Sequence, residues 1–230
     1  MATIVLVHGL WSDGSSWAPV MTELRAMGHA PVAAQLALES MADDVTSVRR
    51  TLATVTGPVL LVGWSYGGAV IGEAAVGTSN VRALAYVAAF APAEGESVSG
   101  LSRKYPGSLI PAHVVVAGDH SYMARDHFGE VMAHDAPSDL IALAAATQKF
   151  VRIGLDRVIV GRPAWLDLPS YYLVASEDRA VPPVLQREMA ERMGATVTEI
   201  ASSHAPLLSH PREVAEFLDS ACNAVSLRSS

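Results

Sequence analysis

The sequence predicts an α/β fold in which a mostly parallel sheet is flanked by helices. Short apolar segments alternate with longer amphipathic ones along most of the 230 residues, which is the pattern of repeated strand–helix units. The segment Val59–Val62 is apolar at every position, as expected of a strand buried on both faces of a sheet. Hydrophobic residues make up 50% of the chain and charged residues 17%, so a core that needs no disulfides is expected.

The first 91 residues are expected to supply four strands with helices between them. The predicted strands are Thr3–Val7, Pro31–Gln35, Val59–Val62 and Val81–Ala88. The predicted helices run from a cap at Ser15 or Ser16 to Met27, from a cap at Ser40 to about Thr54, and from about Tyr66 to Val76. Gly28 is placed to end the first of these helices.

The pattern weakens between residues 92 and 168, where prolines interrupt the chain. We expect this segment to be an insertion that lies over the sheet as a small cap, with residues 1–91 and 169–230 forming the core. Within the insertion, the run Val114-Val115-Val116, a turn at Gly118-Asp119 and the pair Tyr122-Met123 predict a hairpin. The segment Ser138–Phe150 predicts a helix.

Strand–helix alternation returns after residue 168, which indicates that the chain re-enters the sheet there. The predicted elements are a strand at Ser170–Ala175, a helix at Pro182–Met193, a strand at Thr196–Ile200 and a last helix after Pro211. Both prolines suit the first turn of a helix, because the amide hydrogen that proline lacks has no partner within the helix at that position.

The charge balance narrows the range of partners. Sixteen Lys and Arg against 23 Asp and Glu give a net charge of −7, which disfavours a nucleic acid and an anionic membrane surface as partners. A single cysteine, Cys222, cannot form an internal disulfide and favours a reducing compartment, so a cytoplasmic protein is expected. No Cys/His spacing indicates a metal site, and the sequence leaves the oligomeric state open, with a homodimer as one option.

The strongest chemical signal is the pentapeptide Gly63-Trp64-Ser65-Tyr66-Gly67. It follows an apolar strand and opens a predicted helix, which is the context of a nucleophile elbow. The sharp turn forces the serine into a strained backbone conformation, and it requires small residues two positions before and two positions after. Gly63 and Gly67 meet this requirement, and the turn presents the Ser65 hydroxyl at a helix N-terminus that favours negative charge.

A serine hydroxyl needs a base to take its proton, and two of the eight histidines are candidates. His204 lies in a loop directly after the strand at 196–200, at the edge where parallel sheets place ligands. His210 precedes Pro211 and the last helix, which is typical of a helix entry, so His204 is favoured. The other histidines outside the first strand end are expected to be solvated: His29, His113, His120, His127 and His134.

The base in turn needs a carboxylate that fixes its tautomer. Asp178 follows the strand at 170–175, so the chain order Ser65, Asp178, His204 is the one expected of a nucleophile-elbow enzyme. Glu177 is an alternative, although adjacent residues in a turn point in different directions. Asp119 is a second alternative, but it lies in a predicted hairpin turn where aspartate is favoured for local hydrogen bonding.

An acyl-transfer site also needs hydrogen-bond donors for the oxyanion. The backbone amide of Tyr66, the residue after the nucleophile, is one expected donor. The second is expected from Leu10 in the loop after the first strand, where Gly9 allows the chain to turn tightly. Trp11 and Val181 are the expected substrate-binding residues, although Trp11, like Trp17, fits equally well as a core or surface aromatic.

Three stretches together resemble a known family. They are I-V-L-V-H-G-L-W-S-D-G-S-S-W, then V-L-L-V-G-W-S-Y-G-G, and finally S-E-D-R-A-V-P-P followed by S-S-H-A-P-L-L-S-H-P. The chain resembles the α/β-hydrolase superfamily, and within it the small compact branch that includes plant methyl-ester hydrolases and hydroxynitrile lyases. The resemblance implies Ser65 as nucleophile, Asp178 as acid, His204 as base, the Leu10 and Tyr66 amides as oxyanion donors, and a cap over the pocket.

Two departures from this branch bear on the reaction. Trp64 stands before the nucleophile, where the branch often has histidine, and Ala205 follows His204, where hydroxynitrile lyases carry lysine. The second departure argues against cyanohydrin chemistry. The expected activity is hydrolysis of a small, largely apolar carboxylic ester through an acyl-enzyme, without a cofactor. The alternatives are carbon–carbon bond hydrolysis or cofactor-free perhydrolysis on the same three residues, and a ligand-binding receptor of the same fold.

Overall fold

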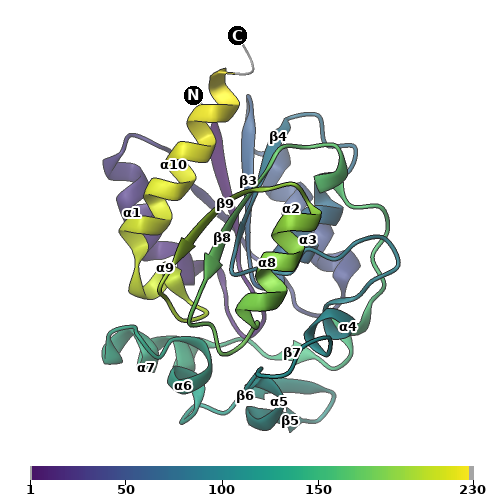
Figure 1. Cartoon of the computed structure of the whole chain (residues 1–230), viewed down its shortest axis with the longest axis vertical. Helices are drawn as coiled ribbons and strands as arrows, with labels where there is room; N and C mark the ends of the chain where they lie inside the picture. The colour runs from purple at the N-terminus through teal and green to yellow at the C-terminus, as the bar shows by residue number, and fades with distance from the viewer. Residues whose placement is uncertain (1, 228–230) are drawn as a thin grey trace.

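A parallel sheet forms the centre of the computed structural model, which describes residues 2–227 (Figure 1). Its six strands, in spatial order, are β2 (Val32–Ala34), β1 (Thr3–Val7), β3 (Val59–Trp64), β4 (Val81–Val87), β8 (Ser170–Ala175) and β9 (Thr196–Ile200). Every neighbouring pair is parallel, so the predicted fold class is confirmed. β3 is buried at all six positions, as its apolar sequence predicts. Residue 1 and residues 228–230, which were assigned to the core, lie outside the described residues.

Helices cover both faces of the sheet. The long ones are α1 (Ala18–Ala26), α2 (Met41–Ala53), α3 (Gly67–Ala74), α8 (Pro183–Arg192) and α10 (Pro211–Leu227). The chain moves one way along the sheet from β1 to β2, and the opposite way from β2 to β3 and from β3 to β4. Because such connections are right-handed, α1 lies on one face of the sheet and α2 and α3 lie on the other. In agreement, α1 packs against α10 and α2 against α3.

Residues 92–168 supply no strand to the main sheet. They form short helices and a separate three-stranded antiparallel sheet, which lie beyond the carboxyl ends of β8 and β9 (Figure 1). The elements are α4 (Val98–Ser102), α5 (Ile110–His113), β5 (Val114–Ala117), β6 (His120–Met123), α6 (Phe128–Met132), α7 (Ser138–Thr147) and β7 (Val151–Arg152). The predicted hairpin is therefore present as β5 and β6, paired from Val114↔Met123 to Ala117↔His120.

Two predicted boundaries were wrong, and in both cases a side chain that bonds to the backbone explains the difference. The first helical segment begins as a 3-10 turn at Gly14–Trp17, and its cap is Asp13, which accepts a hydrogen bond from the Ser15 amide, rather than Ser15 or Ser16. The helix predicted to reach Phe150 ends at Thr147. Gln148 is extended, and its side-chain amide pairs with the Met123 amide and carbonyl at 2.8 and 2.9 Å, so the chain turns to form β7.

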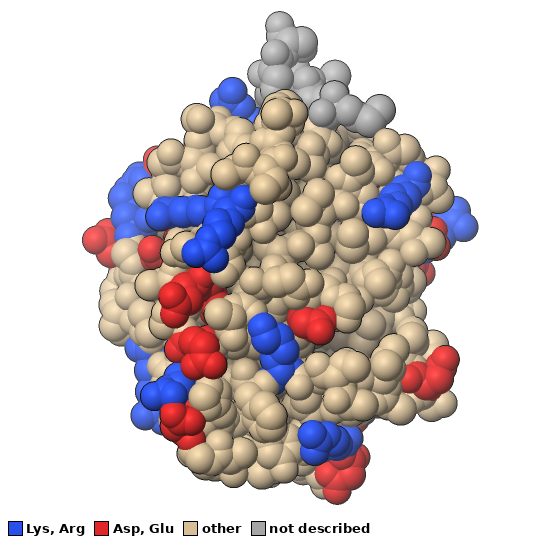
Figure 2. Space-filling model, turned by 180° about the vertical axis from the view of Figure 1, so that it is seen from behind, with Lys and Arg blue, Asp and Glu red and all other residues tan. Residues whose placement is uncertain are grey.

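The surface agrees with the mixed charge of the sequence. On the face seen in Figure 2, basic and acidic side chains lie interspersed among wide uncharged areas. This face therefore has no continuous basic band of the kind that follows a nucleic-acid backbone. Across residues 2–227, no helix is both long enough and apolar enough to cross a membrane.

Candidate active site

Ser65 lies at the turn between β3 and α3 in the strained conformation that the sequence predicts. Its φ of +56° is in the left-handed region, which costs free energy for a residue other than glycine. A Cβ atom on Gly63 would lie 2.6 Å from the backbone of Gly67, and a Cβ on Gly67 would lie 2.6 Å from the carbonyl oxygen of Val7. Because neither backbone can move away, the turn requires glycine at both positions.

Ser65 is the first member of a chain of buried hydrogen-bonding side chains. The Ser65 Oγ atom lies 2.9 Å from Nε2 of His204, and Nδ1 of His204 lies 2.7 Å from Oδ2 of Asp178. All three residues are buried, with 7% of Ser65, 6% of Asp178 and none of His204 exposed. This arrangement allows the imidazole to accept the hydroxyl proton while the carboxylate fixes the ring orientation.

Asp178 is held by contacts that the sequence does not reveal. Its Oδ1 atom accepts hydrogen bonds from the amides of Ala180 and Val181 at 2.7 and 2.8 Å. Its Oδ2 atom accepts a third from the side-chain amide of Gln186 in α8, also at 2.7 Å. Gln186 is fully buried and also accepts a hydrogen bond from the Ala175 amide, so it fixes Asp178 to the end of β8. No motif marks this glutamine, and only its i+8 spacing from Asp178 on the following helix could have suggested it.

Trp64 contacts the loop that carries His204. Its indole Nε1 donates a hydrogen bond to the backbone carbonyl of His204 at 2.7 Å, and the two rings lie 5.5 Å apart between centroids. The residue that departs from the usual histidine at this position thus anchors the loop that carries His204.

The alternatives weighed from the sequence lie elsewhere. Asp119 lies in the hairpin turn and pairs with His120 and Arg152. Glu177 contributes its backbone to the loop, where its amide bonds to Ser202 and its carbonyl accepts a hydrogen bond from His134. His210 contacts Ser209 and lies 3.5 Å from Asp135.

One of the two expected substrate-binding residues needs correction. Val181 is fully buried and lines neither of the two cavities described below. Because its amide donates to Asp178, its contribution is to hold that carboxylate rather than to bind substrate. The expectation of a solvated His29 was also wrong, since His29 is buried and its Nε2 atom lies 2.7 Å from Asp219.

The amides of Leu10 and Tyr66 are available as donors beside Ser65. Neither amide donates a hydrogen bond to another residue within the described part of the chain. Gly9 is needed here for a reason other than a tight turn, because a Cβ on Gly9 would lie 2.8 Å from Cβ of Ser65. The loop that carries Leu10 thus passes directly over the serine.

Two buried side-chain contacts fix the Gly9–Leu10 loop and Tyr66, which carry the expected donor amides. His8 bonds to the Gly9 carbonyl through Nδ1 and accepts from the Leu36 amide through Nε2, and burial lowers its pKa to about 4. The Tyr66 hydroxyl donates to Asp44 at 2.9 Å, and Asp44 also accepts from the Leu38 amide. Burial raises the pKa of Tyr66 and of Asp44, so the phenol stays protonated and its hydrogen bond is kept at neutral pH.

Two cavities share Trp11 as a wall. The first, of about 280 Å³, is also bounded by Trp64 and Ala205, the chain neighbours of Ser65 and His204, and by apolar side chains of α6 and α7. The second, of about 440 Å³, is bounded by Leu10, α5 and the arginines Arg103, Arg152 and Arg157. Trp11 has a left-handed φ of +53°, and its buried indole Nε1 has no hydrogen-bond partner in the described structure. Trp17, in contrast, is fully buried in the core.

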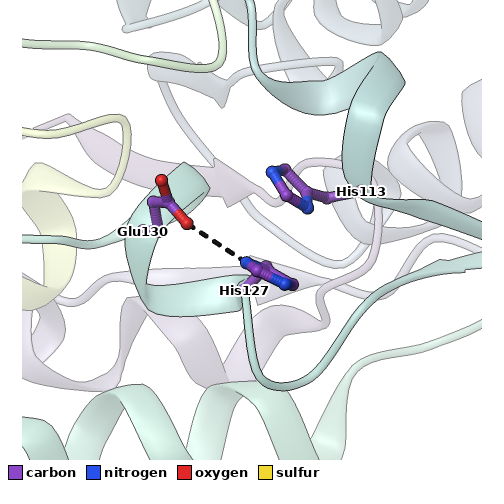
Figure 3. Close-up of side chains that lie close together, drawn as sticks. All are labelled: His113, His127 and Glu130. Atoms are coloured by element: carbon purple, nitrogen blue, oxygen red, sulfur yellow. Dashed lines mark hydrogen bonds and ion pairs between the residues drawn. The ribbon is translucent and has the colours of Figure 1, made fainter.

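One group of side chains among the described residues could hold a metal ion, and it is separate from Ser65. It consists of His113, His127 and Glu130 in the insertion (Figure 3). Neither cavity includes any of the three residues in its lining.

Comparison with known proteins identifies the family of the chain. The family described as the alpha/beta hydrolase family matches residues 4–217. An alpha/beta hydrolase of Aspergillus novofumigatus is 25% identical over 239 residues, covering 95% of each chain. A pyrethroid hydrolase of Sphingobium wenxiniae is 28% identical, covering 93% of this chain and 85% of its own.

The solved structure of a pyrethroid hydrolase from Sphingobium faniae superposes with a TM-score of 0.83 at 24% identity, covering 97% of this chain and 98% of its own. At that identity the likeness concerns the fold. The family match is broader, since it begins in β1, ends within α10 and includes all six strands of the main sheet. The chain belongs to the alpha/beta hydrolase family.

Proposed function

We propose that the protein is a serine hydrolase that cleaves a small carboxylic ester through an acyl-enzyme. The observation that carries the proposal is the continuous hydrogen-bonded chain from Ser65 through His204 to Asp178. Relatives named as a pyrethroid hydrolase and a carbendazim hydrolyzing esterase support the reaction class.

The reaction follows from the positions of these groups. Ser65 Oγ attacks the ester carbonyl carbon while Nε2 of His204 takes the hydroxyl proton. The carbonyl oxygen becomes an oxyanion that the Leu10 and Tyr66 amides stabilise. His204 then gives its proton to the leaving alcohol, and the acyl group stays on Ser65. A water molecule, deprotonated by His204, releases the acid and restores the serine.

The substrate class follows from the first cavity. Its walls are mostly carbon, and Trp11 and Trp64 bring it next to the Ser65 turn. A cavity of about 280 Å³ fits a compact apolar group rather than a long chain. We therefore assign one apolar side of the ester to this cavity. Trp11 is the wall residue that also reaches the second cavity, so it is the proposed substrate-binding residue.

Replacing Ser65 with alanine tests the proposal. A panel of p-nitrophenyl esters of increasing acyl length is hydrolysed by the wild type, and kcat/KM of Ser65→Ala is expected to fall by about 10⁴-fold or more. A fluorophosphonate is expected to label the wild type rapidly and the variant not at all. If Ser65→Ala hydrolyses the esters like the wild type, the proposed nucleophile is wrong.

The same assay separates an enzyme from a receptor of this fold. An enzyme is expected to release p-nitrophenol steadily over many turnovers, well beyond one molecule per protein. A single burst of p-nitrophenol followed by no further release would contradict it, because the acyl group would then stay on the protein.

A further inference from the structure

The open end of the β5–β6 hairpin brings together residues that are distant in the sequence. Val114 and Met123 are the last pair of the ladder, and the Ala124 amide continues it by donating to the carbonyl of His113 at 2.9 Å. His113 therefore lies opposite the chain that leads into α6. His127 directly precedes α6, and Glu130 follows one turn later on the same side of that helix. The backbone thus brings the three residues close together independently of any ligand.

These three side chains face one another. The Nδ1 atom of His127 lies 3.1 Å from Oε2 of Glu130, and the imidazole rings of His113 and His127 lie 4.1 Å apart between centroids. One nitrogen or oxygen atom from each residue lies within 4.8 Å of the other two (Figure 3). His113 makes no side-chain hydrogen bond to any described residue, so both of its ring nitrogens are available as ligands.

We propose that His113, His127 and Glu130 bind one divalent transition-metal ion, of which Zn²⁺ is the best match, and that the ion joins α6 to the open end of the hairpin. Zinc takes imidazole nitrogen at about 2.0–2.1 Å and carboxylate oxygen at about 2.0–2.2 Å in a tetrahedron, which puts neighbouring ligand atoms roughly 3.3 Å apart. The 3.1 Å between His127 and Glu130 is close to that spacing. Water completes the fourth position.

The donor set selects the class of metal. Two imidazoles favour zinc, copper or nickel over magnesium and calcium, which prefer oxygen ligands. The hydrogen bond from His127 lowers the pKa of the Glu130 carboxyl. On binding, the ion takes the position between Nδ1 of His127 and Glu130, and the neutral His127 ring carries its proton on Nε2.

The ion would brace both cavities, because the elements that it joins line them. Phe128 of α6 belongs to the first cavity, and Ile110 of α5 and Val114 of β5 belong to the second. The binding claim does not depend on the proposed hydrolase activity. Its test therefore uses binding and stability, which do not change if the reaction is a different one.

The test is a Zn²⁺ titration of the EDTA-dialysed protein. Binding is measured by calorimetry and, independently, by competition with a chromogenic chelator. The wild type is expected to bind about one equivalent, and His113→Ala and His127→Ala to bind at least about tenfold more weakly. His120→Ala is the matched control, since His120 also lies in the insertion between two carboxylates but has no second histidine beside it. Its affinity is expected to equal that of the wild type.

Two further measurements keep the test decisive if a histidine variant folds poorly. Glu130→Gln keeps the shape of the side chain, so it is expected to unfold at the wild-type temperature in EDTA but to lose the increase that Zn²⁺ gives the wild type. Co²⁺ is expected to give the visible absorption of a tetrahedral site in the wild type alone. Binding below about half an equivalent, or equal Zn²⁺ affinity in the wild type and His113→Ala, would overturn the proposal.

Discussion

The side chains around Ser65 differ in how far the sequence alone reveals them. Gly63, Ser65 and Gly67 are evident because a local turn imposes them, and the structure gives the clash that makes each glycine necessary. His204 and Asp178 could be favoured over their rivals because both follow strands that end at one edge of the sheet.

Gln186 and Trp64 could not be assigned in this way. Gln186 belongs to no motif, and it contacts Asp178 and Ala175 from the following helix. Trp64 lies within the Gly63–Gly67 pentapeptide, but its hydrogen bond reaches His204, 140 residues further along the chain. A tertiary hydrogen bond has no periodicity in the sequence, so these positioning contacts appear only when the structure is known.

Trp64 offers a test of such a positioning contact. Trp64→Phe keeps an aromatic ring but removes the donor to the His204 carbonyl, so the loop that carries the imidazole loses one fixed point. We expect kcat for ester hydrolysis to fall about tenfold with little change in KM, which corresponds to about 1.4 kcal/mol, within the range of one hydrogen bond. Steady-state kinetics on one ester of the panel measures both constants.

Trp165→Phe is the matched control for this substitution. Trp165 also donates its buried indole hydrogen to a backbone carbonyl, that of Pro92, but it does not contact His204. Both variants are expected to lose about 1 kcal/mol of unfolding free energy. Equal kcat values in the two variants would mean that the Trp64 contact is only structural.

At the scale of whole elements, the sequence predicts the regular part of the molecule well. The six strands of the main sheet are confirmed within about two residues. β1 and β3 are evident because they are almost entirely apolar and buried. β9 is exposed at four of its five positions and is evident from its β-branched residues instead. The short helices α4, α5 and α6 were not predicted. Each has five residues or fewer, which is too short for a helical period to show.

The helix α3 carries a test of how closely it approaches β1. A methyl group on Gly67 would lie 2.6 Å from the Val7 carbonyl oxygen and 2.7 Å from that of His8. Gly67→Ala therefore has to push α3 away from the sheet, and we expect it to lower the free energy of unfolding by about 3 kcal/mol and to abolish most esterase activity. Urea denaturation and the ester assay measure the two effects.

Gly72 in the same helix provides the comparison. A Cβ on Gly72 would lie 3.6 Å from its nearest neighbour, Cβ of Pro163, which is ordinary contact. Gly72→Ala is expected to keep activity and to gain roughly 0.5–1 kcal/mol, because alanine loses less conformational entropy in a helix. Equal free energies of unfolding for Gly67→Ala and Gly72→Ala would contradict the close approach of α3 to the end of β1.

At the scale of the whole molecule, the order of strands and the placement of Ser65, His204 and Asp178 at one edge follow from general rules for parallel sheets. The insertion does not follow from them. Its hairpin and the helix beginning at Ser138 were predicted from the sequence. The rest of the insertion is fixed by individual contacts such as that of Gln148 with Met123, which the sequence does not reveal. The cavities and the histidine cluster both depend on the insertion. The resemblance implied a pocket under a cap, but the sequence indicated neither its division into two cavities nor the histidine cluster.

The stability of the whole molecule is expected to depend on pH through His8. The pKa of His8 is lowered by burial to about 4, whereas an unfolded histidine has a value near ~6.5. As the pH falls through 6.5, His8 is protonated in the unfolded chain. In the folded chain it stays neutral until about pH 4. The stabilisation from neutral His8 is therefore complete above pH 6.5 and is lost between pH 6.5 and 4, by about 2 kcal/mol between pH 7 and 4.5.

His8→Gln isolates this contribution, because glutamine can donate and accept hydrogen bonds but does not titrate. The free energy of unfolding is measured in urea at pH 7 and pH 4.5 for both proteins. Its decrease between the two pH values is expected to be about 2 kcal/mol smaller in His8→Gln than in the wild type, even if the two proteins differ in stability at pH 7. His134→Gln, at a half-buried histidine of the insertion, is the comparison variant and is expected to show the larger loss of the wild type. Parallel pH profiles for the wild type and His8→Gln would contradict the buried neutral histidine, and with it the contact that holds the Gly9–Leu10 loop to the end of β2.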